Sequence, residues 1–328
     1  MKRVARILTL AVALAACLTL AAGLWAYWAG KRAQPAYAGA LTLPGLSAPV
    51  TVRFGPHAVP SIEATTLEDL LFAQGFVVAS ERLWQMDLMR RLASGRLAEV
   101  FGEEALPVDR FFRTLGLQRA AEASVRALPA PSRDYLEAYV RGVNAYLSHA
   151  ADRLPLEYLI ARFTPAAWKP ADSLVIAEYM GYMLSFNARE ELVYLRLAAR
   201  LGPERALELF PTDEGIPAPD YARALPEYTA TALQGFDRLL ALPARWGLPT
   251  PGAASNAWAV TGKRTVDGQA LLANDPHLAP TMPAIWYELE MQARGYHAAG
   301  VALPGLPLVV IGHNEALAWG FTTTIADT

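Results

Sequence analysis

Ser255 lies where a run of small residues leads into an alternating apolar pattern. Residues 251–254 are Pro-Gly-Ala-Ala, and residues 255–260 are Ser-Asn-Ala-Trp-Ala-Val. A serine hydroxyl next to a general base is a nucleophile. The same pattern is typical of a serine in an exposed turn before a strand, so the local pattern alone leaves both interpretations open.

Cleavage of the peptide bond between Ala254 and Ser255 would place a free α-amino group beside the serine hydroxyl. An α-amine titrates near ~7.7–8.0 in model compounds, so it is able to act as a general base at neutral pH. One residue would then supply both nucleophile and base. The small residues before Ser255 permit the tight, strained turn that attack on its own preceding carbonyl requires.

Other chemistries have weaker support in the chain. It contains no Gly-x-Ser-x-Gly motif, so an α/β-hydrolase serine is not supported. The spacings between His277, His297 and His313 match no metal-binding motif. A net charge of −2 provides no basic surface for nucleic acid. With 53% apolar and 18% charged residues, the 328-residue chain is expected to be globular with a large core.

Residues 1–32 are predicted to be a signal sequence or a membrane anchor. An uncharged apolar run, residues 7–30, has basic residues on both sides and matches the ~20 residues that span a bilayer, which favours an anchor. Leu-Ala-Ala-Cys at 14–17 resembles a lipoprotein processing box, and Ala-Tyr-Ala at 36–38 resembles a signal-peptidase site. All three alternatives place the rest of the chain in the periplasm or another extracytoplasmic compartment.

The next segment, residues 33–238, is predicted to be mostly helical. A hairpin of residues 51–54 and 61–64 opens it, and Thr66 is the expected cap of a helix that runs to residue 100. Further helices are predicted at 131–147, 173–184 and 190–201. Polar residues among the apolar positions of the first helix indicate either a buried ion-pair network or a solvated helix face: Gln85, Asp87, Arg90 and Arg91.

Residues 239–254 are predicted to be an exposed linker, because prolines interrupt the helical pattern there, and such a stretch suits chain cleavage. From residue 255 onward the apolar period changes from helical to alternating. Strands are predicted at 256–261, 270–273, 286–293, 296–301, 308–311 and 318–323. Helices followed by strands predict an α+β domain in which the helices cover the sheet.

Four motifs occur in order along the chain. They are Ala-Gln-Gly-Phe-Val-Val-Ala-Ser-Glu-Arg-Leu-Trp-Gln-Met-Asp from residue 73, Ser-Asn-Ala-Trp-Ala-Val from 255, Asn-Asp-Pro-His-Leu from 274, and Pro-Gly-Leu-Pro-Leu-Val-Val-Ile-Gly-His-Asn-Glu from 304. In this order they resemble the small chain and the opening of the large chain of the penicillin acylase family. The resemblance covers nearly everything after residue 45.

The resemblance implies a self-processing N-terminal-nucleophile hydrolase with a four-layer αββα core. A small chain, residues 33–238, and a large catalytic chain, which starts with residues 255–328, would form a heterodimer. Ser255 matches the nucleophile. His277 matches a position that is histidine in cephalosporin and acyl-homoserine-lactone acylases, and it is expected to help position the nucleophile or the substrate. Thr323 matches the residue whose backbone N–H donates to the oxyanion.

The resemblance also implies a structural calcium ion, which prefers hard oxygen ligands. Asp327 matches one ligand, and Glu191, or its neighbour Glu190, is the candidate from the small chain; an exposed helix face is the alternative for the glutamates. Because Leu278 is aliphatic where the penicillin G type has an aromatic residue, flexible aliphatic acyl chains are favoured. Acyl-group selection, with core packing as the alternative, is expected at Met183, Phe186, Asn187 and Leu278.

The second oxyanion donor of that family, an asparagine, lies beyond the point that corresponds to Thr328. The chain is therefore expected to be the front part of a longer precursor. The expected activity is hydrolysis of the amide bond of N-acyl compounds such as penicillins and other β-lactams, with no organic cofactor. The alternatives are an acyl-homoserine-lactone or lipopeptide acylase, and a non-catalytic, membrane-anchored binding protein with the same fold.

Overall fold

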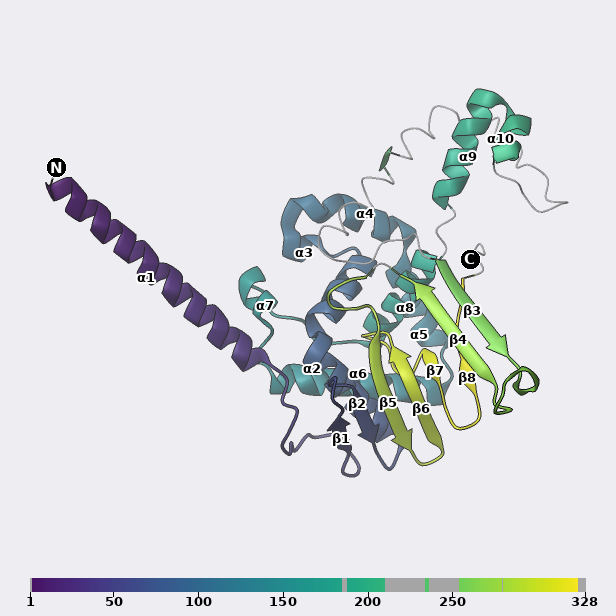
Figure 1. Ribbon diagram of the computed structural model, residues 1–328. Coiled ribbons are helices and arrows are strands. Elements are labelled where there is room, and N and C mark those ends of the chain that lie inside the picture. The colour runs from purple at the N-terminus through teal and green to yellow at the C-terminus, as the bar shows by residue number, and fades with distance from the viewer. Residues whose placement is uncertain (1, 185–187, 210–233, 236–253, 279, 324–328) are drawn as a thin grey trace.

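The computed structural model of the chain describes residues 2–184, 188–209, 234–235, 254–278 and 280–323. It combines helices and sheet, as the α+β prediction requires (Figure 1). The helices are α1 (Lys2–Ala33), α2 (Leu67–Ala93), α3 (Ala98–Phe101), α4 (Leu106–Leu115), α5 (Leu117–Ala127), α6 (Ala130–His149), α7 (Leu156–Ala161), α8 (Pro170–Leu184), α9 (Ala188–Leu201) and α10 (Pro203–Leu209). The strands are β1 (Thr51–Phe54), β2 (Pro60–Glu63), β3 (Ala254–Val260), β4 (Leu271–His277), β5 (Tyr287–Ala293), β6 (Tyr296–Ala302), β7 (Ile311–His313) and β8 (Ala318–Trp319).

The strands within the described residues form two sheets. The larger has the order β1-β2-β5-β6-β7-β8, and β3 pairs with β4 in a separate two-stranded sheet. β2 and β5 run parallel, and the other neighbours run antiparallel. In β5 the side chains of Tyr287, Leu289 and Met291 are buried and alternate with more exposed residues. This face of the sheet packs against the helices, and α2 contacts both β2 and β5.

Helices α2 and α6 pack through a pair of glycines at the centre of the helical layer. A Cβ atom on Gly75 of α2 would lie 2.2 Å from the backbone oxygen of Tyr139, and one on Gly142 of α6 would lie 1.9 Å from the backbone oxygen of Phe72. Neither position has room for a side chain, because the two backbones touch there. The glycines therefore set the distance between the helices on which the sheet rests.

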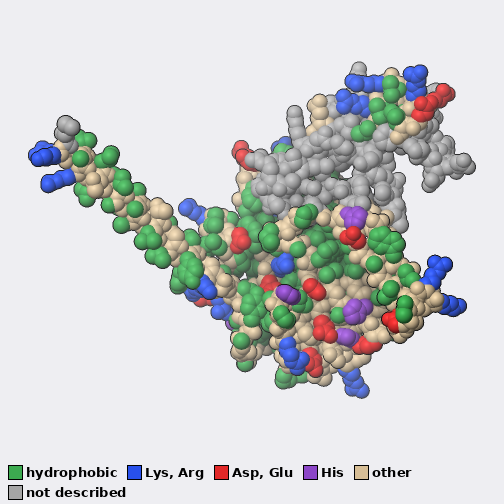
Figure 2. All heavy atoms as spheres, viewed as in Figure 1, with side chains coloured by type: hydrophobic (Ala, Val, Ile, Leu, Met, Phe, Trp, Pro, Cys, Tyr) green, Lys and Arg blue, Asp and Glu red, His purple; other side chains and the backbone are tan. Residues whose placement is uncertain are grey.

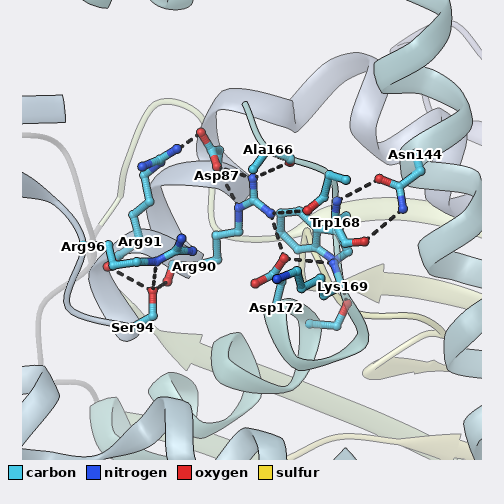
Figure 3. Close-up of polar contacts among 12 residues, drawn as sticks. Asp87, Arg90, Arg91, Ser94, Arg96, Asn144, Ala166, Trp168, Lys169 and Asp172 are labelled. Carbon is cyan, nitrogen blue, oxygen red and sulfur yellow. Dashed lines mark hydrogen bonds and ion pairs between the residues drawn. The ribbon is translucent and has the colours of Figure 1, made fainter. Parts of the chain in front are cut away.

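A buried ion-pair network joins α2 to α8 (Figure 3). The guanidinium of Arg90 donates to Asp87 at 2.7 Å and to Asp172 at 2.7 Å, and all three side chains are at most 8% exposed. Arg91 donates to the second oxygen of Asp87 at 3.2 Å. The buried network is thus the correct alternative for these residues. Gln85 lies outside it and donates to the backbone oxygen of Ala284 at 3.0 Å.

Helix α2 begins as predicted and ends earlier. The hydroxyl of Thr66 accepts a hydrogen bond from the N–H of Asp69 at 3.1 Å, which confirms the predicted cap. The helix was expected to reach residue 100, but Ser94 closes it by donating its hydroxyl to the oxygen of Arg90 at 2.5 Å. Gly95 follows with a φ of +65°, a conformation that favours glycine and breaks the helix.

The strand predicted at 308–311 is also displaced, and β7 starts only at Ile311. Leu308 has a φ of 74°, outside the range of a strand. Its backbone groups are bonded to the buried side chain of Gln74, which accepts from the N–H of Leu308 at 2.9 Å and donates to its oxygen at 3.2 Å. A side-chain amide from α2 thus replaces a neighbouring strand at this point.

Helix α1 extends away from the rest of the molecule (Figure 1) and carries apolar side chains along its length (Figure 2). It has 32 residues, and an 18-residue window within it has a mean hydropathy of 2.4 with no buried residue. Its length and composition suffice to cross a membrane, and they also fit a signal sequence. The predicted linker, residues 239–254, lies outside the described residues except for Ala254.

Candidate active site

Ser255 is the second residue of β3, directly after Ala254, with which the strand begins. β3 and β4 pair antiparallel, with Ala254 opposite His277, Ser255 opposite Pro276, and Ala257 opposite Asn274. The register therefore brings the Asn-Asp-Pro-His motif to the same end of the hairpin as the serine. In Figure 1 this end lies close to the last described residues after β8.

The hydroxyl of Ser255 is held by two hydrogen bonds from the segment after β8. It donates to the hydroxyl oxygen of Thr322 at 2.9 Å, and it accepts the backbone N–H of Thr323 at 3.0 Å. The hydroxyl of Thr322 donates in turn to the backbone oxygen of Ser255 at 2.9 Å. The serine oxygen is thus oriented by residues that lie far from it in the sequence.

Thr323 also ties this segment to the helical layer. Its hydroxyl donates to the backbone oxygen of Leu184, the last residue of α8, at 3.0 Å. The structure thus brings Ser255 and Thr323 together, and their roles as nucleophile and oxyanion donor stay predictions. A backbone N–H stabilises negative charge during acyl transfer where it lies at the position of the oxyanion, and here this N–H contacts the oxygen of the serine itself.

His277 lies across the hairpin from Ala254, and its side chain turns toward neighbours other than the serine. Its Nε2 atom is 3.0 Å from a carboxylate oxygen of Asp275 and 3.4 Å from the side-chain nitrogen of Asn256. The imidazole is 42% exposed. A role for His277 in positioning the nucleophile or the substrate therefore stays a prediction.

Asn274 has a place in the site that the sequence reasoning missed. Its side-chain nitrogen donates to the oxygens of Asn256 and Phe321, each at 2.9 Å, and its side-chain oxygen accepts the N–H of Phe321 at 3.1 Å. The strand predicted at 318–323 accordingly ends at Trp319, because the backbone of Phe321 pairs with this side chain. The sequence signal was its place at the start of the Asn-Asp-Pro-His-Leu motif, three residues before His277.

The residues expected to select the acyl group are only partly described. Met183 is 2% exposed and belongs to the main hydrophobic core, and Leu278 is half-buried and packs against that core. Phe186 and Asn187 lie outside the described residues. The predicted acyl selection is not tested by this arrangement, since core packing would also bury Met183.

The predicted calcium ligands fall largely outside the described part as well. Asp327 is not among the described residues, and Glu190 and Glu191 lie in α9, whose side chains at these two positions are not described. Among the described residues, no three His, Cys, Asp or Glu side chains form a group that could hold a metal ion. The calcium site therefore stays a prediction.

A charged cluster on the larger sheet lies apart from Ser255. His297 is 3.0 Å from Glu290 through Nε2 and 2.5 Å from Glu315 through Nδ1. The hydrogen bond to Glu290 raises the pKa of His297, and the same bond lowers the pKa of Glu290. The pKa of Glu315 is lowered by its own backbone N–H and by His297. These contacts favour a protonated imidazole between two carboxylates.

Comparison with known proteins defines the class. A family model described as penicillin amidase matches residues 49–328. Because this match covers most of the chain, the chain belongs to the penicillin amidase family.

Two curated relatives agree with this assignment. Acyl-homoserine lactone acylase QuiP of Pseudomonas aeruginosa is 39% identical over 302 residues, which cover 89% of this chain and 35% of the relative. Penicillin acylase 2 proenzyme of Pseudomonas sp. (strain SE83) is 34% identical over 303 residues, which cover 90% of this chain and 39% of the relative. The solved thermostable penicillin G acylase from Alcaligenes faecalis is 28% identical, with a TM-score of 0.43 over 52% of this chain and 98% of that one. The chain thus spans between a third and two fifths of the length of these two curated relatives.

Proposed function

We propose that the whole protein is a self-processing amidohydrolase that cleaves the amide bond of N-acyl compounds, with Ser255 as its N-terminal nucleophile. The observation that carries the proposal is the pair of hydrogen bonds at the serine oxygen, one of them from the backbone N–H of Thr323 at 3.0 Å. Membership of the penicillin amidase family supports it. One relative is itself named a proenzyme, which agrees with a chain that is cut before it acts.

In the processing step, the Ser255 oxygen attacks the carbonyl carbon of Ala254. The C–N bond between the two residues breaks, the acyl group moves to the serine oxygen as an ester, and the hydroxyl proton ends on the departing nitrogen. Water then hydrolyses the ester, which leaves a carboxylic acid on Ala254 and a free α-amine on Ser255. The N–H of Thr323 stabilises negative charge on the attacking oxygen or on the oxyanion beside it.

In the catalytic step, the α-amine takes the hydroxyl proton as the serine oxygen attacks the substrate carbonyl. The tetrahedral intermediate collapses, the amide C–N bond breaks, and the proton passes to the leaving amine. Water hydrolyses the acyl-enzyme ester to a carboxylic acid and regenerates the hydroxyl. Thr323 donates its N–H to the oxyanion in both halves of the reaction.

The proposed architecture follows from the same family membership. The small and large chains of one precursor form a heterodimer with a four-layer αββα core. The chain is exported, with α1 as anchor or signal, and acts in the periplasm or another extracytoplasmic compartment. The length and hydropathy of α1 support this part of the proposal.

For the substrate, we propose N-acyl amides with flexible aliphatic acyl chains, with acyl-homoserine lactones as the leading class and penicillins as the second. The 39% identity to an acyl-homoserine lactone acylase supports the first class, and the 34% identity to a penicillin acylase supports the second. The aliphatic Leu278 next to His277 favours an acyl chain over a phenylacetyl ring.

The test uses protein expressed from the complete gene. Amino-terminal sequencing is expected to find a chain that begins Ser-Asn-Ala-Trp, and Ser255→Ala is expected to stay uncut. Cleavage of the Ser255→Ala variant at the wild-type rate would assign the cut to another protease. Release of free amine from an aliphatic acyl-homoserine lactone, an aliphatic penicillin and a phenylacetyl amide is then measured. A preference for the phenylacetyl amide contradicts the proposed preference for aliphatic acyl chains. Inactivity on all three compounds contradicts the proposal that the protein is an amidohydrolase.

Calcium binding by Asp327 together with Glu191 or Glu190 belongs to the same proposal. Oxygen ligands from both chains would let the ion fix the small chain against the large one. Elemental analysis of the purified protein is expected to find calcium. Its removal by a chelator is expected to lower the melting temperature, and Asp327→Asn is expected to abolish that effect.

A further inference from the structure

Asn274 joins the β3–β4 hairpin to the segment after β8, with which the hairpin shares no strand pairing. It belongs to β4, it donates across the hairpin to the oxygen of Asn256 in β3, and it makes two hydrogen bonds to Phe321 after β8. The two sheets are separate in their strand pairing. The Asn274 amide therefore connects the hairpin that carries Ser255 to the segment that carries Thr323.

We propose that Asn274 is a positioning residue for the reaction of Ser255, an inference that rests on the proposed function. Its side chain holds the backbone of Phe321, and Phe321 is two residues before Thr323, whose N–H reaches the Ser255 oxygen. Only two peptide units separate Phe321 from Thr323, so the position of Phe321 restricts the position of the Thr323 N–H. Displacement of Phe321 therefore moves the donor away from the serine oxygen, where misplacement by ~1 Å costs on the order of 100-fold in rate.

The chemistry of the contact requires an amide. The side-chain nitrogen of Asn274 donates to two carbonyl oxygens, and its side-chain oxygen accepts from an N–H. Only an amide offers two donor hydrogens and an acceptor oxygen in this arrangement. An ionised aspartate would have no donor for the two carbonyl oxygens and would repel them. Alanine would leave the backbone groups of Phe321 without their partner.

Gly320 provides independent support for a close fit at this place. A Cβ atom on Gly320 would lie 2.7 Å from three side-chain atoms of Asn274. The chain turns past the asparagine at a distance that only glycine permits. Gly320→Ala is thus a second way to displace Asn274 that leaves its amide intact.

Asn314 offers a matched control. Its side-chain oxygen accepts the backbone N–H groups of Ala316 at 2.9 Å and Leu317 at 2.8 Å in the turn between β7 and β8. It is also an asparagine that holds a backbone segment by its side chain, and none of these bonds involves Ser255, Thr322 or Thr323. Asn314→Ala removes a comparable structural contact from the same part of the sheet.

The experiment compares wild type, Asn274→Ala, Asn274→Asp, Gly320→Ala and Asn314→Ala, each expressed from the complete gene. Three quantities are measured: the first-order rate at which the chain beginning with Ser255 appears, kcat per mole of free amino-terminal serine, and KM. Asn274→Ala and Gly320→Ala are expected to lower the cleavage rate and kcat by about 10- to 100-fold, with KM changed less than about threefold. Asn314→Ala is expected to keep both rates within about threefold of wild type at a similar melting temperature.

The pH profile of Asn274→Asp separates positioning from general loss of structure. Below the pKa of the introduced carboxyl group, its protonated form donates to one carbonyl and still accepts from Phe321. The activity of Asn274→Asp relative to wild type is therefore expected to rise about tenfold between pH 8 and pH 5. A flat ratio contradicts the inference.

The two proposals fail in different ways. Wild-type protein that is neither cut before Ser255 nor active overturns the proposed function and this inference with it. Wild-type protein that is cut and active, with Asn274→Ala at wild-type rates, overturns the inference alone. Equal losses of kcat in Asn274→Ala and Asn314→Ala also overturn it, because the effect then belongs to the sheet as a whole.

Discussion

The backbone N–H of Thr323 donates to the side-chain oxygen of Ser255 at 3.0 Å while the bond between Ala254 and Ser255 is still intact. The N–H and the serine oxygen are thus in contact in the chain with this peptide bond intact. Because the donor is a main-chain group, its function depends on the presence of the N–H and on the path of the backbone. The threonine side chain adds a separate anchor to Leu184.

Thr323→Pro is expected to remove the donor, since proline has no N–H. We expect processing and kcat to fall by about 100- to 1000-fold, the usual effect of losing one oxyanion donor. Thr323→Val is the control, because it keeps the N–H and the β-branched shape and loses the hydroxyl and its bond to Leu184. Rates measured by chain cleavage and amine release should separate the two variants, and equal losses in both would assign the effect to the side chain.

The glycine pair of α2 and α6 makes a stability prediction. Gly142→Ala places a methyl group 1.9 Å from the backbone oxygen of Phe72, so the helices must move apart. We expect a loss of about 1–3 kcal/mol or more in the free energy of unfolding. The control is Gly181→Ala in α8, where nothing lies within 4 Å; there alanine is expected to add about 0.5–1 kcal/mol. Thermal or urea denaturation of both variants is the measurement, and shifts of the same sign would contradict the packing argument.

The elements predicted best from the sequence are those whose bounds are set by the local apolar pattern and by capping residues. The hairpin of β1 and β2, the Thr66 cap, α6, α8, α9 and the alternating strands β5 and β6 all lie close to their predicted positions. In these elements the apolar period and the terminal residues agree with the tertiary contacts. The expected role of Thr323 came from motif resemblance, because no local pattern joins residues so far apart. The expected cleavage before Ser255 was also indicated by the small residues and the proline-rich stretch that precede it.

The two displaced strands share one physical cause. Both displaced strands, predicted at 308–311 and 318–323, have backbone groups bonded to a side-chain amide, from Gln74 in one case and Asn274 in the other. Such an amide bonds to a backbone N–H and C=O in the same way as a neighbouring strand would. The segment therefore keeps the alternating apolar pattern of a strand although it pairs with no strand at this point. Neither partner lies within the segment itself, and so the segment's own residues contain no sign of the bond.

The buried ion pairs of Arg90 predict that removal of this one charge lowers the free energy of unfolding strongly. Arg90→Met is expected to leave Asp87 and Asp172 buried without their shared guanidinium, at a loss of about 3–5 kcal/mol in the free energy of unfolding. Arg53→Met is the control, because Arg53 pairs with Glu63 at the surface with its side chain 66% exposed, and such pairs contribute about 0–1 kcal/mol. Urea denaturation measures both, and similar losses would show that burial does not decide the strength of these pairs.

The cluster of His297, Glu290 and Glu315 predicts how stability varies with pH. The pKa of His297 is raised in the folded state, so its contribution is complete below its unfolded pKa of ~6.5 and is lost as the pH rises through the folded value. The pKa values of Glu290 and Glu315 are lowered, so their contribution is complete above ~4.5 and is lost as the pH falls through their folded values.

The cluster therefore stabilises the fold most between about pH 4.5 and 6.5. The test is the variant His297→Gln. His313, which also lowers the pKa of both Glu290 and Glu315, is still present in that variant. The difference in melting temperature between wild type and His297→Gln is expected to be largest near pH 5.5 and to shrink by pH 9. His57→Gln, in the exposed turn between β1 and β2, is expected to leave the melting temperature unchanged across this range. A difference for His297→Gln that grows toward pH 9 would mean that the imidazole acts as a neutral side chain in this cluster.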